Sequence, residues 1–340
     1  MNVLLTGGMG YIGSHIALTL LHHKYQVTIL DNLSNSNIDV LNSLKFLSAK
    51  EPKFIKGDVL NTELVATVLH DHKIDAVIHL AGLKAVGESV AKPLMYYKNN
   101  VFGAISLLEA MKSCKVFNLV FSSSATVYGI PNFLPISEEH PCKPNNPYGR
   151  TKFYIEEILS DLIITDKNWN IISLRYFNPV GSHESGLIGD NPNGIPNNLM
   201  PYINQVASGQ RTHLKIFGND YDTPDGTGIR DYIHVEDLAN AHLDALNNIY
   251  LNNDHQNGLL NNFNIGTGKG YSVLEVVHSF ELANRLDIPY KIYPRRDGDI
   301  ASSFADPKKA NNFLGWKAKQ SIDDMCFSSW NFQKNISQKK

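Results

Sequence analysis

The sequence predicts an α/β protein, with a doubly wound parallel sheet and a second, smaller mixed α/β domain. Short apolar, β-branched runs alternate with helix-length segments along the first half of the chain, which is typical of strand–helix–strand units with parallel strands. A glycine-rich turn follows the first run, and polar side chains gather where later runs end. Together these three observations predict a ligand site at the carboxyl edge of the sheet.

The composition is that of a globular protein. The chain has 340 residues, of which 43% are hydrophobic and 19% are charged, so it can bury a full core and corresponds to about two domains. The net charge is −2, and both signs are mixed along the chain. We therefore expect neither a nucleic-acid surface nor a charged tail that binds a protein partner.

The cysteines and the apolar runs predict a cytoplasmic protein without a metal. Cys114, Cys142 and Cys326 are scattered, which argues against a disulfide framework or a cysteine-based metal site and suits a reducing compartment. The apolar run in MNVLLTGG is too short for a signal peptide. No apolar stretch reaches about 18 residues, so no membrane span is expected.

The first strand and helix predict a dinucleotide-binding turn. Residues 2–5 form an apolar strand, and an apolar-periodic helix continues to about His23. Gly7, Gly10 and Gly13 lie at the junction, where the backbone must approach a pyrophosphate at a helix N-terminus. A glycine triplet alone is weak evidence, but the strand-to-helix context favours a nucleotide over a plain tight turn.

Asp31 predicts the choice of cofactor. It ends the strand 26–30, about twenty residues after the glycines, where a carboxylate can accept hydrogen bonds from an adenosine ribose. Its negative charge would repel a ribose phosphate, so NAD is favoured over NADP. The loop Asp31–Ser36 is expected to surround that ribose, and a role as a helix cap is the alternative for Asp31.

Three further strands end in small or polar residues, and we predict them at residues 54–56, 74–80 and 117–121. The first is followed by Asp58 and the second by Ala81, Gly82, Leu83 and Lys84, so a cofactor can lie close to the backbone and Lys84 can reach a phosphate. The third delivers Ser124 to the carboxyl edge. A long helix is expected over residues 93–112 and contains Asn99.

Tyr148 and Lys152 predict a general base. Asn146 and Pro147 mark the start of a helix, on which Tyr148 and Lys152 are i and i+4 and share one face. A phenol keeps its proton to about pH 10, and a nearby ammonium is expected to lower that pKa. An isolated Tyr-x-x-x-Lys is usually an ordinary surface pair, but here it accompanies the dinucleotide turn.

The second half of the chain predicts the smaller domain. A sixth strand covers residues 170–175, and beyond about Gly181 the chain is rich in Gly, Pro and Asn. We expect residues 1–180 to form the NAD-binding Rossmann domain, completed by 229–266, and 181–340 to form a smaller, partly interleaved domain. The polar tail from about Lys334 is expected to be disordered.

The motifs resemble those of the extended short-chain dehydrogenase/reductase family and, within it, the UDP-glucose 4-epimerases. The resemblance runs from the glycine turn to about Trp330. The segments that carry it are Gly7–His15, His79–Ser89, Ser122–Gly129, Pro147–Lys152, Arg175–Pro179, Gly194–Tyr202 and Gly228–Val235.

The resemblance implies two sets of binding residues. The implied NAD contacts are Tyr11, Ile12, Asp31, Asn32, Leu33, Ser34, Asn35, Ser36, Asp58, Val59, Leu80, Ala81, Gly82, Leu83, Lys84, Asn99, Ser124, Tyr148, Lys152 and Phe177. The implied UDP-sugar contacts are Lys84, Ser124, Tyr148, Asn178, Asn198, Leu199, Leu214, Lys215, Phe217, Arg230, Val273, Arg296, Asp299 and Ser303.

Residue chemistry agrees with the implied UDP-sugar set. Arg230 and Arg296 can neutralise a diphosphate through their forks of donors. Phe217 offers a face to uracil, and Asp299 can accept from the uridine ribose. The alternative for Arg296 is a surface ion pair with Asp297 or Asp299.

The implied reaction interconverts UDP-glucose and UDP-galactose. Tyr148 takes the proton of the 4-hydroxyl, Ser124 hydrogen-bonds the same oxygen, and Lys152 keeps the phenolate charged. Oxidation at C4, rotation of the 4-keto sugar and re-reduction then invert the centre. The alternatives are another NAD-dependent nucleotide-sugar epimerase or dehydratase, or a non-catalytic nucleotide-sugar sensor. Ala125 and Thr126 stand where dehydratases carry carboxylic acids, which disfavours elimination.

Specificity and assembly are also implied by the resemblance. Family members restricted to plain sugars have a tyrosine four residues after Asp299, whereas this chain has Ser303. We therefore expect UDP-GlcNAc and UDP-GalNAc to be accepted too, unless Phe304 fills the space. The family pairs the helices near 93–112 and 148–161 across a homodimer, so a homodimer is expected.

Overall fold

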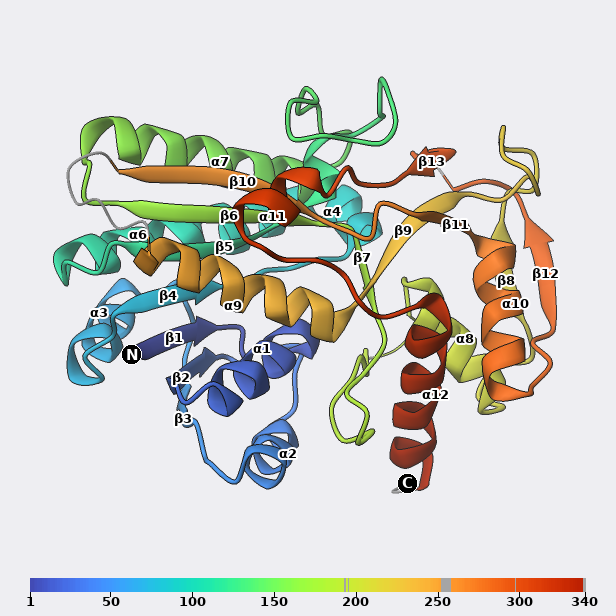
Figure 1. The fold of residues 1–340 in the computed structure, drawn as a ribbon, viewed down its shortest axis with the longest axis horizontal. Coiled ribbons are helices and arrows are strands. Elements are labelled where there is room, and N and C mark those ends of the chain that lie inside the picture. Colours follow the sequence, from blue (N-terminus) through green and yellow to red (C-terminus); the bar gives the residue numbers. More distant parts are fainter. Residues whose placement is uncertain (193, 195, 252–257, 297, 339–340) are drawn as a thin grey trace.

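The centre of the computed structural model is a seven-stranded sheet in the order β10-β6-β5-β4-β1-β2-β3 (Figure 1). The structure describes residues 1–192, 194, 196–251, 258–296 and 298–338. All neighbouring strands of this sheet are parallel, which confirms the predicted doubly wound fold. Its strands are β1 (Asn2–Thr6), β2 (Gln26–Asp31), β3 (Lys53–Lys56), β4 (Ala76–His79), β5 (Asn118–Ser124), β6 (Asn170–Tyr176) and β10 (Leu259–Ile265).

Helices cover both faces of the sheet and enclose two separate cores (Figure 1). One layer contains α1 (Tyr11–His22), α2 (Asp39–Ser48) and α9 (Val235–Leu251), and the other contains α3 (Thr62–Asp71), α6 (Gly103–Ser113) and α7 (Pro147–Thr165). Strand β1 contributes to both cores, because its side chains point alternately to the two faces of the sheet. Val3 and Leu5 belong to the first core, and Leu4 belongs to the second.

The helix predicted over residues 93–112 is interrupted. The chain forms α4 (Val86–Ala91) and α5 (Pro93–Tyr96), then a π-helical turn over Tyr97–Phe102, and only then α6. Such wide turns occur often at functional sites. This one carries Asn99 and Asn100, so the interruption falls where the sequence predicts a cofactor contact.

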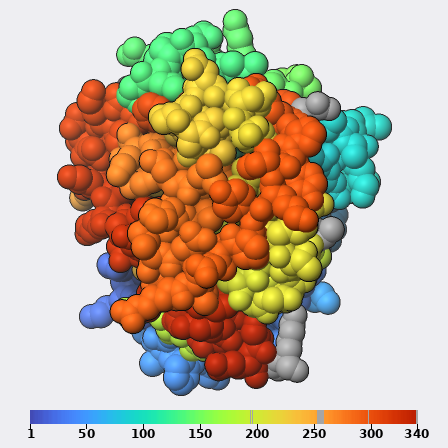
Figure 2. Space-filling model, turned by 90° about the vertical axis from the view of Figure 1, so that its right-hand side faces the viewer, coloured from blue at the N-terminus to red at the C-terminus, as the bar shows by residue number. Residues whose placement is uncertain are grey.

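The rest of the chain forms smaller sheets at the carboxyl end of the large sheet. A four-stranded sheet joins β7 (Asn178–Val180), β9 (Ile229–His234), β11 (Gly270–Ser272) and β13 (Ser302–Ser303), and a pair joins β8 (Leu214–Phe217) to β12 (Tyr290–Tyr293). The accompanying helices are α8 (Leu199–Ala207), α10 (Val273–Asn284) and α12 (Ile322–Gln338), whereas α11 (Lys308–Phe313) packs against β10 of the large sheet. Figure 2 shows this end, where the segments coloured yellow and orange lie against one another.

Two expectations need correction. Of the predicted segment 229–266, β10 joins the large sheet beside β6, but β9 pairs with β7, β11 and β13 instead. An apolar run indicates a strand without indicating its partner. The tail also differs, because residues 334–338 are helical within α12, where Asn335 Nδ2 donates to the carbonyls of Ser185 and Gly186.

Some predicted features lie outside the described residues, namely Ile195 in one motif, Asp297 as an alternative partner of Arg296, and residues 339–340 of the tail. No helix of the described chain is long and apolar enough to cross a membrane.

Candidate active site

The glycine turn between β1 and α1 forms a cradle that side chains would fill. Gly7 has φ +72°, and a Cβ there would lie 2.8 Å from the backbone nitrogen of Ala81. A Cβ at Gly13 would collide with the carbonyl oxygen of Gly7. Gly10 is the N-cap of α1 and supplies no side-chain cap, so amides at this helix N-terminus can face an anion. The cradle therefore fits a pyrophosphate.

Asp31 organises the loop beside that cradle. One carboxylate oxygen accepts from the amide of Met9 at 3.0 Å, and the other accepts from the amide of Leu33 at 2.9 Å and the hydroxyl of Ser36 at 3.0 Å. A carboxylate has about four acceptor positions, so about one remains for a ribose hydroxyl. Asn32 Nδ2 donates to Asp58 at 2.9 Å, which brings the next predicted cofactor residue to the same loop.

Asn100 fastens the loop after β4, and the sequence reasoning missed it. Its side chain is 2% exposed. Its oxygen accepts from the Leu83 amide at 2.8 Å and from Asn99 Nδ2 at 3.0 Å, while its nitrogen donates to the Leu83 carbonyl and to Thr151 Oγ1, both at 3.0 Å. The sequence signal that could have indicated Asn100 was an amide side chain inside an apolar helical pattern, since a buried amide needs hydrogen-bond partners.

Lys84 follows Leu83 in the loop after β4, close to Tyr11 and Asp190. Its Nζ is 3.9 Å from Asp190 and 5.9 Å from the centre of the Tyr11 ring. Its side chain is 47% exposed, so its ammonium stays near water while it faces the glycine turn.

Ser124, Tyr148 and Lys152 meet at the carboxyl edge of the sheet. Ser124 ends β5, and Tyr148 and Lys152 lie on the first turns of α7, which Asn146 caps by accepting from the Gly149 amide at 2.9 Å. The three residues are 7%, 7% and 5% exposed. The Ser124 hydroxyl is close enough to Tyr148 to act to lower the pKa of its phenol. The three predicted catalytic side chains are therefore neighbours in a nearly dry site.

The expected lowering of the Tyr148 pKa is wrong for the protein alone. Burial raises the pKa of Tyr148 to about 12, although the nearby Ser124 hydroxyl acts to lower it. Burial also lowers the pKa of Lys152 to about 8, against the attraction of Glu156. Lys152 does not offset the effect of burial on the Tyr148 pKa, because its ammonium is directed elsewhere. Its Nζ donates to the Ser122 carbonyl at 2.6 Å and lies 4.9 Å from the centre of the Phe121 ring.

A buried ion pair lies behind Lys152 and was also not predicted. Glu156 is one turn further along α7, and the Arg175 guanidinium on β6 donates to both of its oxygens. Arg175 also donates to the hydroxyl of Tyr128 at 3.0 Å, and Tyr128 donates to Asn264 Oδ1 at 2.6 Å. This network ties the catalytic helix to the strands beneath it.

One cluster contains four of the predicted UDP-sugar residues, namely Phe217, Arg230, Arg296 and Asp299, and a fifth, Ser303, lies beside it. The Arg296 guanidinium lies 5.0 Å from the centre of the Phe217 ring, and its Nε donates to Asp299 at 2.9 Å. Arg230 Nη2 lies 3.9 Å from the other oxygen of Asp299. Ser303 pairs with Arg230 between β13 and β9. Two cations, an aromatic face and a carboxylate thus share one place, and the ion pair with Asp299 offered as the alternative for Arg296 is present as well.

The other predicted UDP-sugar residues are more spread out. Asn178 is exposed on β7, Asn198 is the N-cap of α8, and Lys215 Nζ lies 5.1 Å from the centre of the Tyr293 ring. Leu214, by contrast, is 1% exposed and packs in the core of the smaller sheets. Its side chain is therefore committed to packing.

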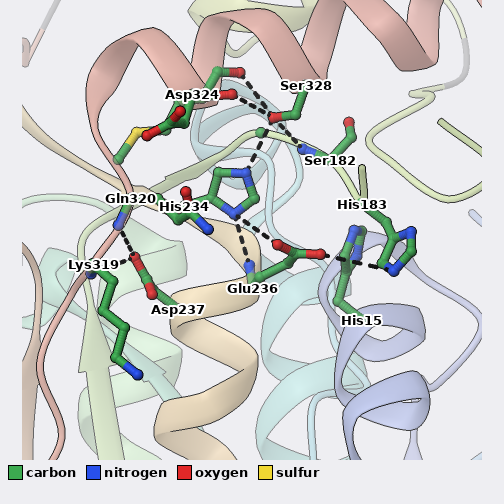
Figure 3. A network of polar contacts seen from close by, with 12 residues as sticks. His15, Ser182, His183, His234, Glu236, Asp237, Lys319, Gln320, Asp324 and Ser328 are labelled. Carbon is green, nitrogen blue, oxygen red and sulfur yellow. Dashed lines mark hydrogen bonds and ion pairs between the residues drawn. The ribbon is translucent and has the colours of Figure 1, made fainter. Parts of the chain in front are cut away.

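The turn after β7 joins the glycine turn to α12. Tyr11 donates to the Gly181 carbonyl at 2.7 Å, and the amides of Gly181 and Ser182 donate to Ser329 at 3.1 Å and Ser328 at 3.2 Å. Figure 3 shows Ser328 between the Ser182 backbone and the ring of His234, whose Nε2 lies 3.1 Å from the serine oxygen. Among the described residues, no three His, Cys, Asp or Glu side chains are grouped so that they could hold a metal ion.

The chain is similar to known proteins along almost its whole length. Residues 4–328 match a family model described as GDP-mannose 4,6 dehydratase. UDP-glucose 4-epimerase of Bacillus subtilis is 53% identical over 333 residues, with 98% of this chain and 97% of that protein covered. The enzyme of the same name from Dictyostelium discoideum is 52% identical, with 97% and 95% covered.

Two solved structures have nearly the same fold. A UDP-glucose 4-epimerase from Stenotrophomonas maltophila with bound NAD and formylated UDP-arabinopyranose has a TM-score of 0.97, 47% identity and full coverage of both chains. The enzyme from Bifidobacterium longum in complex with NAD+ and UDP has a TM-score of 0.95 and 49% identity, with 99% of each chain covered.

Proposed function

The chain belongs to the UDP-glucose 4-epimerase family, and we infer from this membership which residues carry the reaction. It is an isomerase that interconverts UDP-glucose and UDP-galactose, and its cofactor is NAD. The observation that best supports the assignment of residues is the burial of Ser124, Tyr148 and Lys152 at the strand ends beside the glycine turn.

We assign the binding of NAD to the first part of the chain. The turn of Gly7, Gly10 and Gly13 takes the pyrophosphate, and the loop from Asp31 takes the adenosine ribose. We assign the residues around Leu83 and Asn99 to contact the part of NAD between the pyrophosphate and Tyr148. Bound NAD would supply hydride-transfer chemistry at C4 of the sugar.

The proton chemistry belongs to the chain itself. Tyr148, as a phenolate, takes the proton from the sugar 4-hydroxyl, and Ser124 hydrogen-bonds the same oxygen. We assign Lys152 to hold the cofactor ribose. The positive charge that favours the phenolate would come mainly from the bound cofactor, because the Lys152 ammonium is aimed at the Ser122 carbonyl. Because the site must present both faces of the 4-keto sugar, the protein holds the nucleotide firmly and the hexose loosely. Arg230 and Arg296 are suited to hold the diphosphate.

Dehydration is a weaker candidate, although the family model is described by a dehydratase. Elimination needs acid and base groups beside the serine. The two residues after Ser124 are Ala125 and Thr126, and neither carries a carboxylate. A non-catalytic sensor would have no need of a buried serine, tyrosine and lysine together.

Acetylated sugars are the second substrate class that we propose. Ser303 lies beside Arg230, and its small side chain leaves room for an acetamido group. The next residue, Phe304, is the side chain that could fill that room. Adjacent residues of an extended chain point to opposite sides, and the Phe304 ring lies against Gly270 instead.

We also propose a cytoplasmic homodimer with two functional parts. Residues 1–180 bind NAD and residues 181–340 bind the UDP-sugar, with β10 of the second part completing the first. The cytoplasm is supported by the free state of Cys114, Cys142 and Cys326. The homodimer is supported by exposed apolar side chains on neighbouring helices, considered below.

The proposed function is tested by an epimerisation assay without added NAD. Purified protein is given UDP-galactose, and in parallel UDP-GalNAc, and the products are separated by chromatography. We expect conversion of both to the gluco epimers. Failure to convert UDP-galactose even after NAD is supplied would overturn the proposal.

A further inference from the structure

Thr126 surrounds the hydroxyl of Ser124 with donors. The Thr126 amide donates to Ser124 Oγ at 3.3 Å, and the Thr126 hydroxyl donates to the same oxygen at 3.0 Å. Ser124 is the N-cap of a single 3-10 turn over Ala125–Val127, which fixes this geometry. A serine hydroxyl has two acceptor positions and one donor. Both acceptor positions are therefore in use.

The remaining proton of Ser124 has one evident destination. The Ser124 hydroxyl is close enough to the phenol of Tyr148 to act on its pKa, and it lowers that pKa against the effect of burial. Thr126 also contacts the start of α7, because a Cβ at Gly149 would lie 2.7 Å from the Thr126 carbonyl oxygen. Gly149 directly follows Tyr148. Thr126 therefore contacts both the Ser124 hydroxyl and the helix backbone next to Tyr148.

We propose that Thr126 is a positioning residue, whose hydroxyl turns the proton of Ser124 toward the oxygen of Tyr148 before the sugar binds. Once the sugar is bound, Ser124 donates the same proton to the sugar 4-oxygen. The inference rests on the proposed function and deepens it, because a hydrogen bond donated to a phenolate favours the charged form. Without the threonine hydroxyl, Ser124 regains an acceptor position and can rotate its proton away. Tyr148 then loses part of the support that makes it a base.

The test compares variants that remove or keep the hydroxyl at position 126. Thr126→Val has nearly the same shape but no hydroxyl, Thr126→Ala is a second such variant, and Thr126→Ser is the matched control. We expect the acid limb of kcat/KM for UDP-galactose to move up by about one pH unit in both Val and Ala variants. At neutral pH, kcat should fall about tenfold with little change in KM, and the Ser variant should match the wild type.

A direct titration separates this idea from a purely structural role. The ultraviolet absorbance of ionised tyrosine is followed against pH in the holoenzyme, and the curve of Tyr148→Phe is subtracted. The Tyr148 component should titrate later in Thr126→Val than in the wild type. An unshifted component, or a Ser variant that behaves like the Val variant, would overturn the proposal. If Tyr148→Phe itself turned over normally, the proposed function would fail instead.

Discussion

Tyr148 is placed where ionisation is costly for the protein alone. Burial raises its pKa to about 12, and the hydroxyl of Ser124 opposes this only in part. Lys152 lies on the same helix face, but its ammonium is aimed at the Ser122 carbonyl. Tyr148 therefore needs further positive charge to act as a base. We expect that charge to come from the bound cofactor, so that Tyr148 becomes a base only when the site is occupied.

Replacing the tyrosine tests its role as the general base. Tyr148→Phe removes the only atom assigned to take the proton, and general bases contribute about 10²–10⁴-fold to turnover. We expect a loss of kcat of about that size in a coupled assay with UDP-galactose. Binding of NAD and UDP, measured by calorimetry, should stay close to wild type, because neither the glycine turn nor Arg230 is altered. Turnover within about twofold of the wild type would refute the assignment.

Replacing Ser303 tests the size of the sugar pocket. Ser303→Tyr adds an aromatic ring beside Arg230, and we expect conversion of UDP-GalNAc to fall by at least about tenfold while UDP-galactose turnover stays similar. Ser302→Tyr, one position earlier on the same strand, is the control because its side chain points to the opposite side. Equal conversion of UDP-GalNAc by Ser303→Tyr and wild type would contradict the prediction.

At the scale of elements, the ion pair of Glu156 and Arg175 holds α7 on β6. The side chains are 5% and 6% exposed, so each charge depends on the other. We predict that Arg175→Leu lowers the free energy of unfolding by about 3–5 kcal/mol, since it leaves a buried carboxylate unpaired. Urea unfolding followed by circular dichroism measures this.

The double variant is the control for that prediction. Glu156→Leu with Arg175→Leu removes both charges together, so it should be less destabilised than Arg175→Leu alone. A single variant that unfolds at the same urea concentration as the wild type would show that the pair does not stabilise the helix.

Elements were predictable where the signal was local. The glycine spacing, Asp31 at a strand end and the Asn146-Pro147 start of α7 were read from neighbouring residues, and each lies at the expected element. The partner of β9 was not predictable, because its apolar run would suit either sheet. The π-helical turn at Asn100 and the pKa of Tyr148 depend on burial among segments distant in sequence, which no spacing reports.

At the scale of the whole molecule, an apolar surface covers neighbouring helices. Leu94 on α5 is 82% exposed and Phe102 is 54% exposed, while Tyr97 stacks on Tyr154 of α7 with ring centres 6.1 Å apart. We predict that Leu94→Glu with Phe102→Glu converts a dimer to a monomer in light scattering after gel filtration. Leu282→Glu on α10, where the leucine is 66% exposed, is the control and should remain dimeric. A wild-type protein that elutes as a monomer would contradict the proposal.

Buried histidines predict how the molecule responds to acid. Burial lowers the pKa of His15 and His79 to about 3, and of His234 and His242 to about 4. The unfolded chain binds these protons first, so stability is intact above about pH 6.5 and falls as pH falls toward about 4, by up to about 1.4 kcal/mol per pH unit for each histidine. Glu236 acts in the opposite direction, because burial raises its pKa to about 7.

Urea unfolding at about pH 7 and about pH 5 measures this slope. His242→Gln should flatten it by about one histidine's share, and a change at the exposed His70, such as His70→Gln, is the control. A wild-type stability that does not change over this interval would contradict the prediction.

The hydrogen bonds between α12 and the turn after β7 have a consequence for biosynthesis. The amide of Ser182 finds its acceptor in Ser328, which the ribosome adds 146 residues later. The nucleotide-binding strands β1 to β6 can pair while synthesis continues, but the turn that carries Gly181 remains without these acceptors until α12 has emerged. A nascent chain stalled before α12 would therefore contain the cofactor cradle and lack the hydroxyls that fix the turn beside it.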